Sequence, residues 1–251
     1  MPATAPLFRP SPLLGLLIGL FLMHCTVPAD RPHAPQDARQ DVMYQVGTLT
    51  SLLEGEFESP STIGDLTQRG TLGLGTVNRL DGEMVIVGGT AYAIRNDGSV
   101  DTLDEATGTP FGIVTPFEVD TTLTLRDVDG FSAFQSQLDE AQPATSSLYA
   151  FRATGAFDSL QTRSVPAQQP PYPTLEEVIA TQTRFPFRNT SGTLVGVRIP
   201  AVFDGVNAVG HHAHFITARR SGGGHVLDLH ASELTVQIDR SSSLQVNPHE
   251  P

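Results

Sequence analysis

Two histidines separated by one residue, then a glycine-rich segment and a third histidine, constrain the C-terminal part of this chain. Residues 210–217 alternate polar and apolar side chains, as a half-buried β-strand does, so His212 and His214 lie on one face. The segment that follows contains a serine and three glycines, a composition typical of a turn. If an antiparallel hairpin turns at residues 219–220, His225 lies directly opposite His214, and His212 lies diagonal to both.

Three imidazoles at neighbouring positions of a hairpin can converge on a metal ion. Directly opposed residues lie about 5 Å apart and diagonal ones about 7–8 Å apart. Three protein ligands leave positions for water or substrate, which is typical of catalytic rather than structural zinc. The alternatives are polar residues of an ordinary strand or a pH-sensitive surface. We expect His211 to face the opposite side of the strand, and we do not expect His33, His230 or His249 to be ligands.

The N-terminus has the pattern of an export signal. In residues 1–25, Arg9 precedes an apolar run at 13–23 that is short for a permanent membrane anchor. Cys25, the one cysteine of the chain, directly follows this run, as in a bacterial lipoprotein signal; an ordinary cleaved signal peptide is the alternative. Residues 26–42 are rich in Pro, Ala, Asp and Gln and predict a disordered linker. We therefore expect a periplasmic or extracellular protein, tethered to a membrane if Cys25 is lipidated.

Charge narrows the range of partners. The net charge is −12 and all 15 basic residues are arginines, which argues against binding to nucleic acid or to an anionic membrane surface. An anionic substrate would therefore need a specific arginine to receive it. Residues 43–251 are sufficient for one large domain or two small, closely packed ones.

Strand patterns dominate this part of the chain. Capping boxes that start at Thr62 and Thr174 predict two short helices, and Phe131, Phe134 and Leu138 recur at the spacing of a third. The pattern predicts a β-rich α+β fold with two packed mixed or antiparallel sheets, few short helices and a metal site on a C-terminal β-hairpin. The expected strands are 43–49, 72–78, 83–87, 90–94, 111–117, 121–128, 147–154, 193–199, 210–217, 224–230 and 234–238.

Three further charged residues are candidates for function. Glu83 opens an otherwise apolar strand, where it is either a solvated strand end or an inward acid whose pKa is raised by burial. Arg163 precedes a proline-rich segment that can hold a guanidinium in a fixed orientation for a carboxylate; the alternative is a surface salt bridge. Glu250 lies in the C-terminal tail, where a frayed terminus is the ordinary expectation.

Taken together, several segments resemble the alpha-acetolactate decarboxylase family. No single segment is specific for this family, but the order and spacing of the segments together are specific. The resemblance extends over residues 44–238. The segments that carry it are 63–66, 73–83, 109–115, 162–166, 192–196 and 210–228.

The resemblance implies a site and its residues. It places the family's zinc on His212, His214 and His225, the three histidines that the hairpin also selects. It implies that Glu83 and Arg163 are active-site residues, that Thr76 lines the same pocket, and that a glutamate from the tail contributes, for which the chain offers Glu250. His211 stands where the family usually has a tyrosine. The family is usually described as dimeric, so the resemblance implies a homodimer.

The reaction implied by the resemblance is loss of CO2 from (S)-2-acetolactate to give (R)-acetoin, a step of acetoin and butanediol formation. In that reaction zinc acts as a Lewis acid that stabilises an enediolate, which is then protonated on one face. One alternative is an exported three-histidine metalloprotein with hydrolytic or oxygenase chemistry of the cupin kind. Cupin-like sites usually add a glutamate soon after the histidine pair, where this chain has Ala218, Arg219 and Arg220. A second alternative is a non-enzymatic exported protein that binds metal or acts in adhesion.

Overall fold

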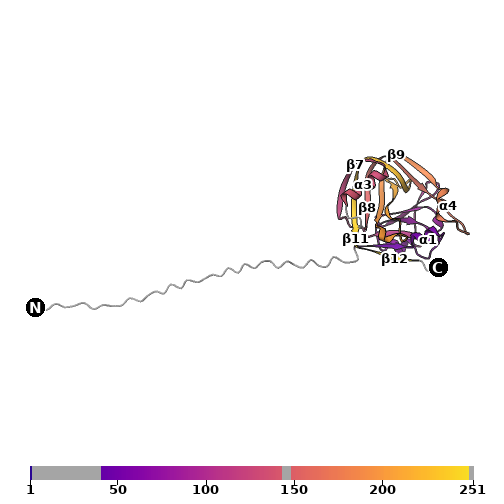
Figure 1. Ribbon diagram of the computed structural model, residues 1–251, viewed down its shortest axis with the longest axis horizontal. Coiled ribbons are helices and arrows are strands. Elements are labelled where there is room, and N and C mark those ends of the chain that lie inside the picture. The colour runs from indigo at the N-terminus through magenta and orange to yellow at the C-terminus, as the bar shows by residue number, and fades with distance from the viewer. Residues whose placement is uncertain (2–40, 143–147, 249–251) are drawn as a thin grey trace. The chain divides into compact units, whose positions relative to one another are not determined.

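A computed structural model describes Met1 and residues 41–142 and 148–248 (Figure 1). The predicted signal peptide with Cys25, the predicted linker as far as residue 40, and Glu250 lie outside the described residues. Two β-sheets make up most of the described part, as expected for a β-rich α+β fold. In Figure 1 the indigo and purple strands belong to the first sheet and the magenta to yellow strands mainly to the second.

The first sheet contains seven strands in the order β12-β1-β6-β2-β3-β4-β5. All its pairs are antiparallel except β1 with β12, so the sheet is mixed. Gly88 and Gly89, both at positive φ, form the tight turn between β3 and β4. The strands are β1 (Val42–Val46), β2 (Leu72–Thr76), β3 (Glu83–Val87), β4 (Thr90–Ile94), β5 (Val100–Thr102), β6 (Phe111–Thr115) and β12 (Ser243–Asn247).

The second sheet is antiparallel, in the order β10-β9-β8-β11-β7. Because β10 also pairs with the start of β11, the strands β8, β9, β10 and β11 form a closed ring of pairings. The ring places the predicted hairpin directly against β8 and β9. The strands are β7 (Thr121–Asp129), β8 (Leu148–Ser164), β9 (Thr183–Ile199), β10 (Gly210–Thr217) and β11 (Gly223–Ser241).

Helices are few and short, as the capping signals predict. Thr62 and Thr174 cap α2 and α4 through capping boxes with Asp65 and Glu177. Among the described residues no helix has the length and apolar character needed to cross a membrane. The helices are α1 (Leu49–Leu53), α2 (Ile63–Thr67), α3 (Phe131–Ala141) and α4 (Leu175–Ala180), with the 3-10 turns η1 (Asn78–Leu80) and η2 (Ala201–Phe203).

The largest differences from expectation concern strand length. The predicted strand 147–154, whose first residue lies outside the described residues, and the predicted strand 193–199 fall in two 17-residue strands, β8 and β9, which pair with each other along nearly their whole length. Segments 224–230 and 234–238 are one 19-residue strand, β11. The long pairing accommodates Pro186 and Gly192 of β9 and Gly155 of β8 within the strands.

One strand ends earlier than expected, and two strands were not expected. The predicted strand 43–49 ends at Val46, because Gly47 adopts φ 69° and Thr48 accepts a hydrogen bond from the Ser51 N–H to start α1. Strands β5 and β12 were not predicted, since both are short and most of their residues are exposed to solvent.

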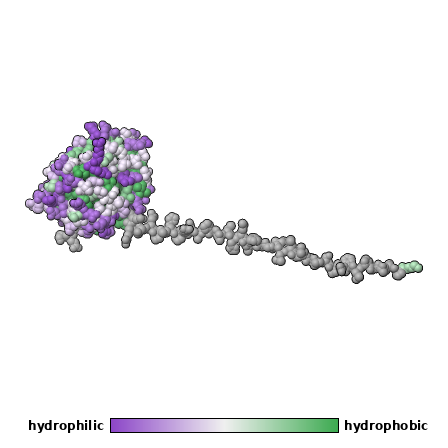
Figure 2. Space-filling model, turned by 180° about the vertical axis from the view of Figure 1, so that it is seen from behind, coloured by the Kyte–Doolittle hydropathy of each residue, from purple (hydrophilic) through white to green (hydrophobic). Residues whose placement is uncertain are grey.

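Hydrophobic contacts join the two sheets and set the direction of the functional side chains. Val85 of β3 packs in a cluster with Leu74 of β2 and Ile216 of β10, so this face of each strand looks toward the other sheet. By alternation, Glu83 shares the face of Val85. The same rule directs His212 and His214 toward the first sheet, together with Ile216. The polar residues therefore lie in the seam between the sheets. On the outer face that Figure 2 displays, hydrophilic and hydrophobic residues are interspersed.

Asp239 is a buried carboxyl group where β11 passes the first sheet. It is 3 % exposed and accepts a hydrogen bond from Thr115 Oγ1 at 2.8 Å. Burial raises the pKa of Asp239 to about 6. The folded protein then binds more protons than the unfolded chain between about pH 4 and pH 6, so this group lowers the stability as the pH rises through that window.

Asp239→Asn is therefore expected to stabilise the protein at pH 7 by about 1–2 kcal/mol, allowing for solvent screening, and to change little at pH 4. The asparagine oxygen can still accept the Thr115 hydrogen bond. Urea unfolding at both pH values measures the effect. If the unfolding free energy of the variant depended on pH as that of the parent does, Asp239 would not be the group that lowers the stability between about pH 4 and pH 6.

Candidate metal centre

The β10–β11 hairpin has the register that the sequence predicts. His214 pairs with His225, and Phe215 pairs with Gly224. The glycines are required at the crossing with β8 and β10: a Cβ on Gly223 would lie 2.1 Å from the Phe215 oxygen, and one on Gly224 would lie 2.4 Å from the Arg163 oxygen. The backbone at these glycines passes very close to β10 and β8, and this close packing brings His225 next to His212 and His214.

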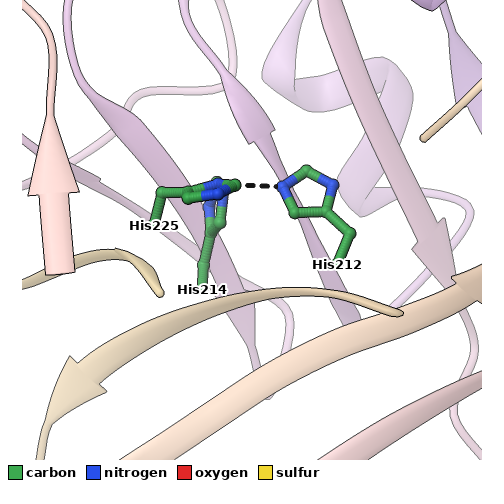
Figure 3. A group of neighbouring side chains, drawn as sticks. All are labelled: His212, His214 and His225. Carbon is green, nitrogen blue, oxygen red and sulfur yellow. Dashed lines mark hydrogen bonds between the residues drawn. The ribbon is translucent and has the colours of Figure 1, made fainter. Parts of the chain in front are cut away.

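The three histidines converge on one small volume (Figure 3). His212 Nε2 lies 3.1 Å from His225 Nδ1, which lies 3.3 Å from His214 Nε2. All three candidate ligand atoms lie within 4.8 Å of one another. In Figure 3 the rings approach from three directions, with the nitrogens of His212 and His225 facing each other. The prediction of a three-histidine cluster is confirmed.

The protonation of the histidines suits metal binding. The Nδ1–H of His214 donates to the carbonyl oxygen of Met84 at 2.8 Å, which leaves the Nε2 lone pair directed into the cluster. Burial lowers the pKa of His212 and of His214 to about 3, and the pKa of His225 well below its usual value. All three rings are therefore neutral at pH 7, and neutral imidazole is the form that binds a metal.

His212 differs from His214 in its second nitrogen. Its Nδ1 is buried and has no hydrogen-bond partner within residues 41–142 and 148–248. Ligating histidines ordinarily have such a partner. The donor set of three nitrogens, one already oriented by a backbone carbonyl, fits a divalent metal that accepts imidazole, such as zinc.

Glu83 and Arg163 meet beside the histidines. Arg163 Nη1 lies 2.5 Å from Glu83 Oε1, and Glu83 Oε2 lies 3.3 Å from His214 Nε2. The side chain of Arg163 is 13 % exposed and that of Glu83 is 8 % exposed. Glu83 is therefore not a solvated strand end, and Arg163 does not form a surface salt bridge. Burial raises the pKa of Glu83, against the opposing effect of the Arg163 charge.

Strand pairing within each sheet places Arg163 beside a histidine of the cluster and Glu83 beside Thr76. His225 pairs with Arg163 across β11 and β8, and Thr76 pairs with Glu83 across β2 and β3. Opposed residues on one face of a sheet are nearest neighbours. Thr76 Oγ1 donates to the Gly82 carbonyl at 2.8 Å, which ties the turn before Glu83 to β2. Of the residues that the resemblance selects, Glu250 is the one that lies outside the described residues.

His211 and His230 take no part in the cluster, and His33 and His249 lie outside the described residues. His211 faces away from the cluster, with Nε2 2.7 Å from Tyr149 Oη and its ring against Phe151. His230 bonds to Asp129 at 3.0 Å and takes no part in the cluster.

A cavity of about 430 Å³ opens beside the three histidines. Thr76, Glu83 and Arg163 line it together with the histidines, and much of the remaining wall is apolar. Sequence reasoning did not select the apolar wall. Its residues come from segments without a common period, and α1 itself was not expected. The apolar lining includes Leu49, Leu52, Leu80, Phe111, Leu175 and Ile179.

Comparison with known proteins identifies the family of this chain. The family model for alpha-acetolactate decarboxylase matches residues 43–250. The chain belongs to the alpha-acetolactate decarboxylase family. The alpha-acetolactate decarboxylase of Methylococcus capsulatus is 38 % identical over 204 residues, which cover 81 % of this chain and 78 % of that protein. The one from Methanosarcina mazei is 41 % identical over 202 residues, covering 80 % of this chain and 70 % of that protein.

Solved structures agree with the family assignment and with the fold. The crystal structure of alpha-acetolactate decarboxylase from Bacillus subtilis superposes with a TM-score of 0.81 at 33 % identity, covering 84 % of this chain and 90 % of that one. A Staphylococcus aureus protein described as similar to alpha-acetolactate decarboxylase gives a TM-score of 0.79 at 30 % identity. The resemblance noted in the sequence, and the β-rich α+β fold expected with it, are confirmed. Because alpha-acetolactate decarboxylases are carboxy-lyases, the chain belongs to a family of carboxy-lyases.

Proposed function

We propose that this protein decarboxylates (S)-2-acetolactate to (R)-acetoin with a zinc ion held by three histidines. The observation that carries the proposal is the convergence of His212, His214 and His225 with Glu83 and Arg163 in the wall of one cavity. Relatives at 38–41 % identity bear the name alpha-acetolactate decarboxylase. A site for metal binding alone would not need a buried acid and a buried arginine beside the histidines.

The metal ligands would be the Nε2 atoms of His212 and His214 and the Nδ1 atom of His225, the nitrogens that face one another. Bound zinc would supply a Lewis acid that draws electron density from the ketone oxygen of the substrate. Because the three imidazoles are neutral, they leave the positive charge of the ion uncompensated. The Met84 carbonyl keeps the His214 ring in one orientation and one tautomer.

Arg163 is proposed to bind the carboxylate of the substrate. A guanidinium has five N–H donors; Nη1 bonds to Glu83, and the other donors are available for a second carboxylate. In a chain of net charge −12, an anionic substrate needs such a local cation. The ion pair with Arg163 also holds the carboxyl group of Glu83 in one position.

Glu83 is proposed to be the proton donor. The bond between the carboxyl carbon and its neighbour breaks, the electron pair stays on the substrate, and Glu83 gives its proton to that neighbouring carbon. Burial raises the pKa of Glu83 and favours its protonated form. A single donor fixed on one side delivers the proton to one face, which would produce one acetoin enantiomer.

The function is tested by supplying racemic acetolactate to the zinc-loaded protein and separating the acetoin on a chiral column. Formation of (R)-acetoin in large excess is the expected result. Zinc binding without CO2 release would leave the metal site but exclude the decarboxylase, and racemic acetoin would remove the single-donor mechanism.

Arg163→Lys is expected to lower kcat/KM for acetolactate by at least about tenfold, because an ammonium cannot offer a planar pair of donors. The matched control is Arg184→Lys. Arg184 is the exposed cross-strand partner of Arg163, and the same change there should leave kcat/KM within about twofold. Equal kinetics for the parent and Arg163→Lys would contradict bidentate binding.

Export and dimer formation are proposals that rest on the N-terminal sequence and on the family resemblance. Mass spectrometry of the protein from its native cells tests whether the chain is cut before residue 42 or lipidated at Cys25. Light scattering of the purified protein tests the dimer. An uncut N-terminus or a monomer would contradict the respective proposal.

A further inference from the structure

The wall of the cavity contains both polar and apolar groups. Its polar groups are the metal centre with Glu83 and Arg163. Two short helices that contact each other, α1 and α4, also line the cavity, with leucine and isoleucine side chains. We call this wall the apolar arm, defined by Leu49, Leu52, Leu53, Leu175 and Ile179.

The apolar arm is held in place by the local sequence. Thr48 caps α1, and the capping box of Thr174 and Glu177 starts α4. Leu52 of α1 and Val178 of α4 are buried in one hydrophobic cluster, against which Leu175 packs. Leu53 remains 47 % exposed. The two helices therefore form a fixed apolar wall that still reaches solvent at its outer side.

The volume of the cavity exceeds what acetolactate fills. A liquid water occupies about 30 Å³. Acetolactate has nine non-hydrogen atoms, and even if each took the space of a whole water, the molecule would occupy roughly 270 Å³. The cavity measures about 430 Å³. With the polar groups of the substrate bound by the metal centre and Arg163, space remains for contacts with the apolar arm.

We propose, on the basis of the decarboxylase function proposed above, that the apolar arm binds an extended alkyl chain. The protein would then decarboxylate 2-hydroxy-3-oxo acids that carry a chain of about four carbons in place of a methyl group of acetolactate. The reaction is unchanged: the carboxyl carbon leaves as CO2, its bonding electrons stay on the substrate, and the adjacent carbon takes a proton. Each methylene placed against the arm adds about fourfold to binding in the transition state.

The test compares CO2 release from three racemic acids by the zinc-loaded full chain. They are acetolactate, 2-butyl-2-hydroxy-3-oxobutanoate and its isomer 2-hydroxy-2-methyl-3-oxoheptanoate, which has the long chain on the acyl side. A kcat/KM for either long acid that equals or exceeds the value for acetolactate supports the proposal. Turnover of acetolactate with kcat/KM for both long acids lower by about 100-fold or more overturns it and leaves the proposed function intact. Failure with all three acids overturns both.

Ile179→Phe tests the location of the binding site, since a larger side chain there occupies the arm. We expect the ratio of kcat/KM for the long acid to that for acetolactate to fall at least about tenfold, mainly through KM. Val119→Phe, an exposed position outside the cavity lining, is the matched control and should leave the ratio unchanged. Ile179→Ala should keep or raise the ratio, and a thermal unfolding curve of each variant shows that it is folded. An unchanged ratio in folded Ile179→Phe would contradict the assignment of the arm.

Discussion

Glu83→Gln is expected to lower kcat for acetolactate decarboxylation by about 10²–10⁴-fold, the usual contribution of a general acid. The glutamine is nearly isosteric and its amide oxygen can still accept the hydrogen bond from Arg163, but the amide cannot release a proton to carbon. Bound zinc should stay unchanged, because Glu83 is not one of the three nitrogen ligands. The residual product should lose its enantiomeric excess, since water would then protonate either face.

Glu140→Gln provides the matched control for this variant. Glu140 is exposed on α3, and its replacement should leave kcat, zinc content and enantiomeric excess at parent values. The combination of metal analysis and chiral chromatography separates loss of a proton donor from loss of structure. Full activity and enantiomeric purity in Glu83→Gln would show that another group delivers the proton.

His214→Ala is expected to weaken zinc binding by more than about 100-fold and to abolish measurable decarboxylation. Loss of a residue that only orients a ligand already costs 10–100-fold in metal affinity, and His214 is proposed to be a ligand itself. It is also the most buried of the three histidines, at 1 % exposed, and its removal takes away the hydrogen bond to the Met84 carbonyl.

His230→Ala carries the same substitution outside the cluster and should keep both zinc and activity. Zinc content after dialysis against a weak chelator, measured by elemental analysis, reports the effect on the site directly. If His214→Ala retained zinc and turnover at the level of His230→Ala, the three-histidine centre would not be the catalytic metal site.

The metal hairpin is the part of the site that sequence reasoning could predict in detail. Alternation places His212 and His214 on one face, and the position of the turn determines that His225 pairs with His214. Both rules are local, so they need no knowledge of the rest of the fold. The short helices α2 and α4 were predictable for the same reason, because their capping boxes are read within four residues.

The remaining parts of the site depend on contacts between distant segments. Glu83 and Arg163 are separated by 80 residues and lie on different sheets. The local sequence made each a candidate, but only the family resemblance placed both in one site. The expected strand 147–154 stopped short of Gly155, whereas β8 continues to Ser164. A Cβ at Gly155 would lie only 2.9 Å from Leu234 Cδ2, so the glycine lets β11 pass closely. The apolar arm has no sequence pattern at all, since it arises where α1 and α4 meet.

The most direct test of metal-dependent decarboxylation at the three histidines is a zinc titration of metal-free protein. Chelator-treated protein receives zinc in steps, and bound zinc and CO2 release from acetolactate are measured at each step. We predict no CO2 release without metal and a rate that rises in proportion to bound zinc, up to one ion per chain. Full turnover by metal-free protein, or one bound zinc per chain without turnover, would contradict the account.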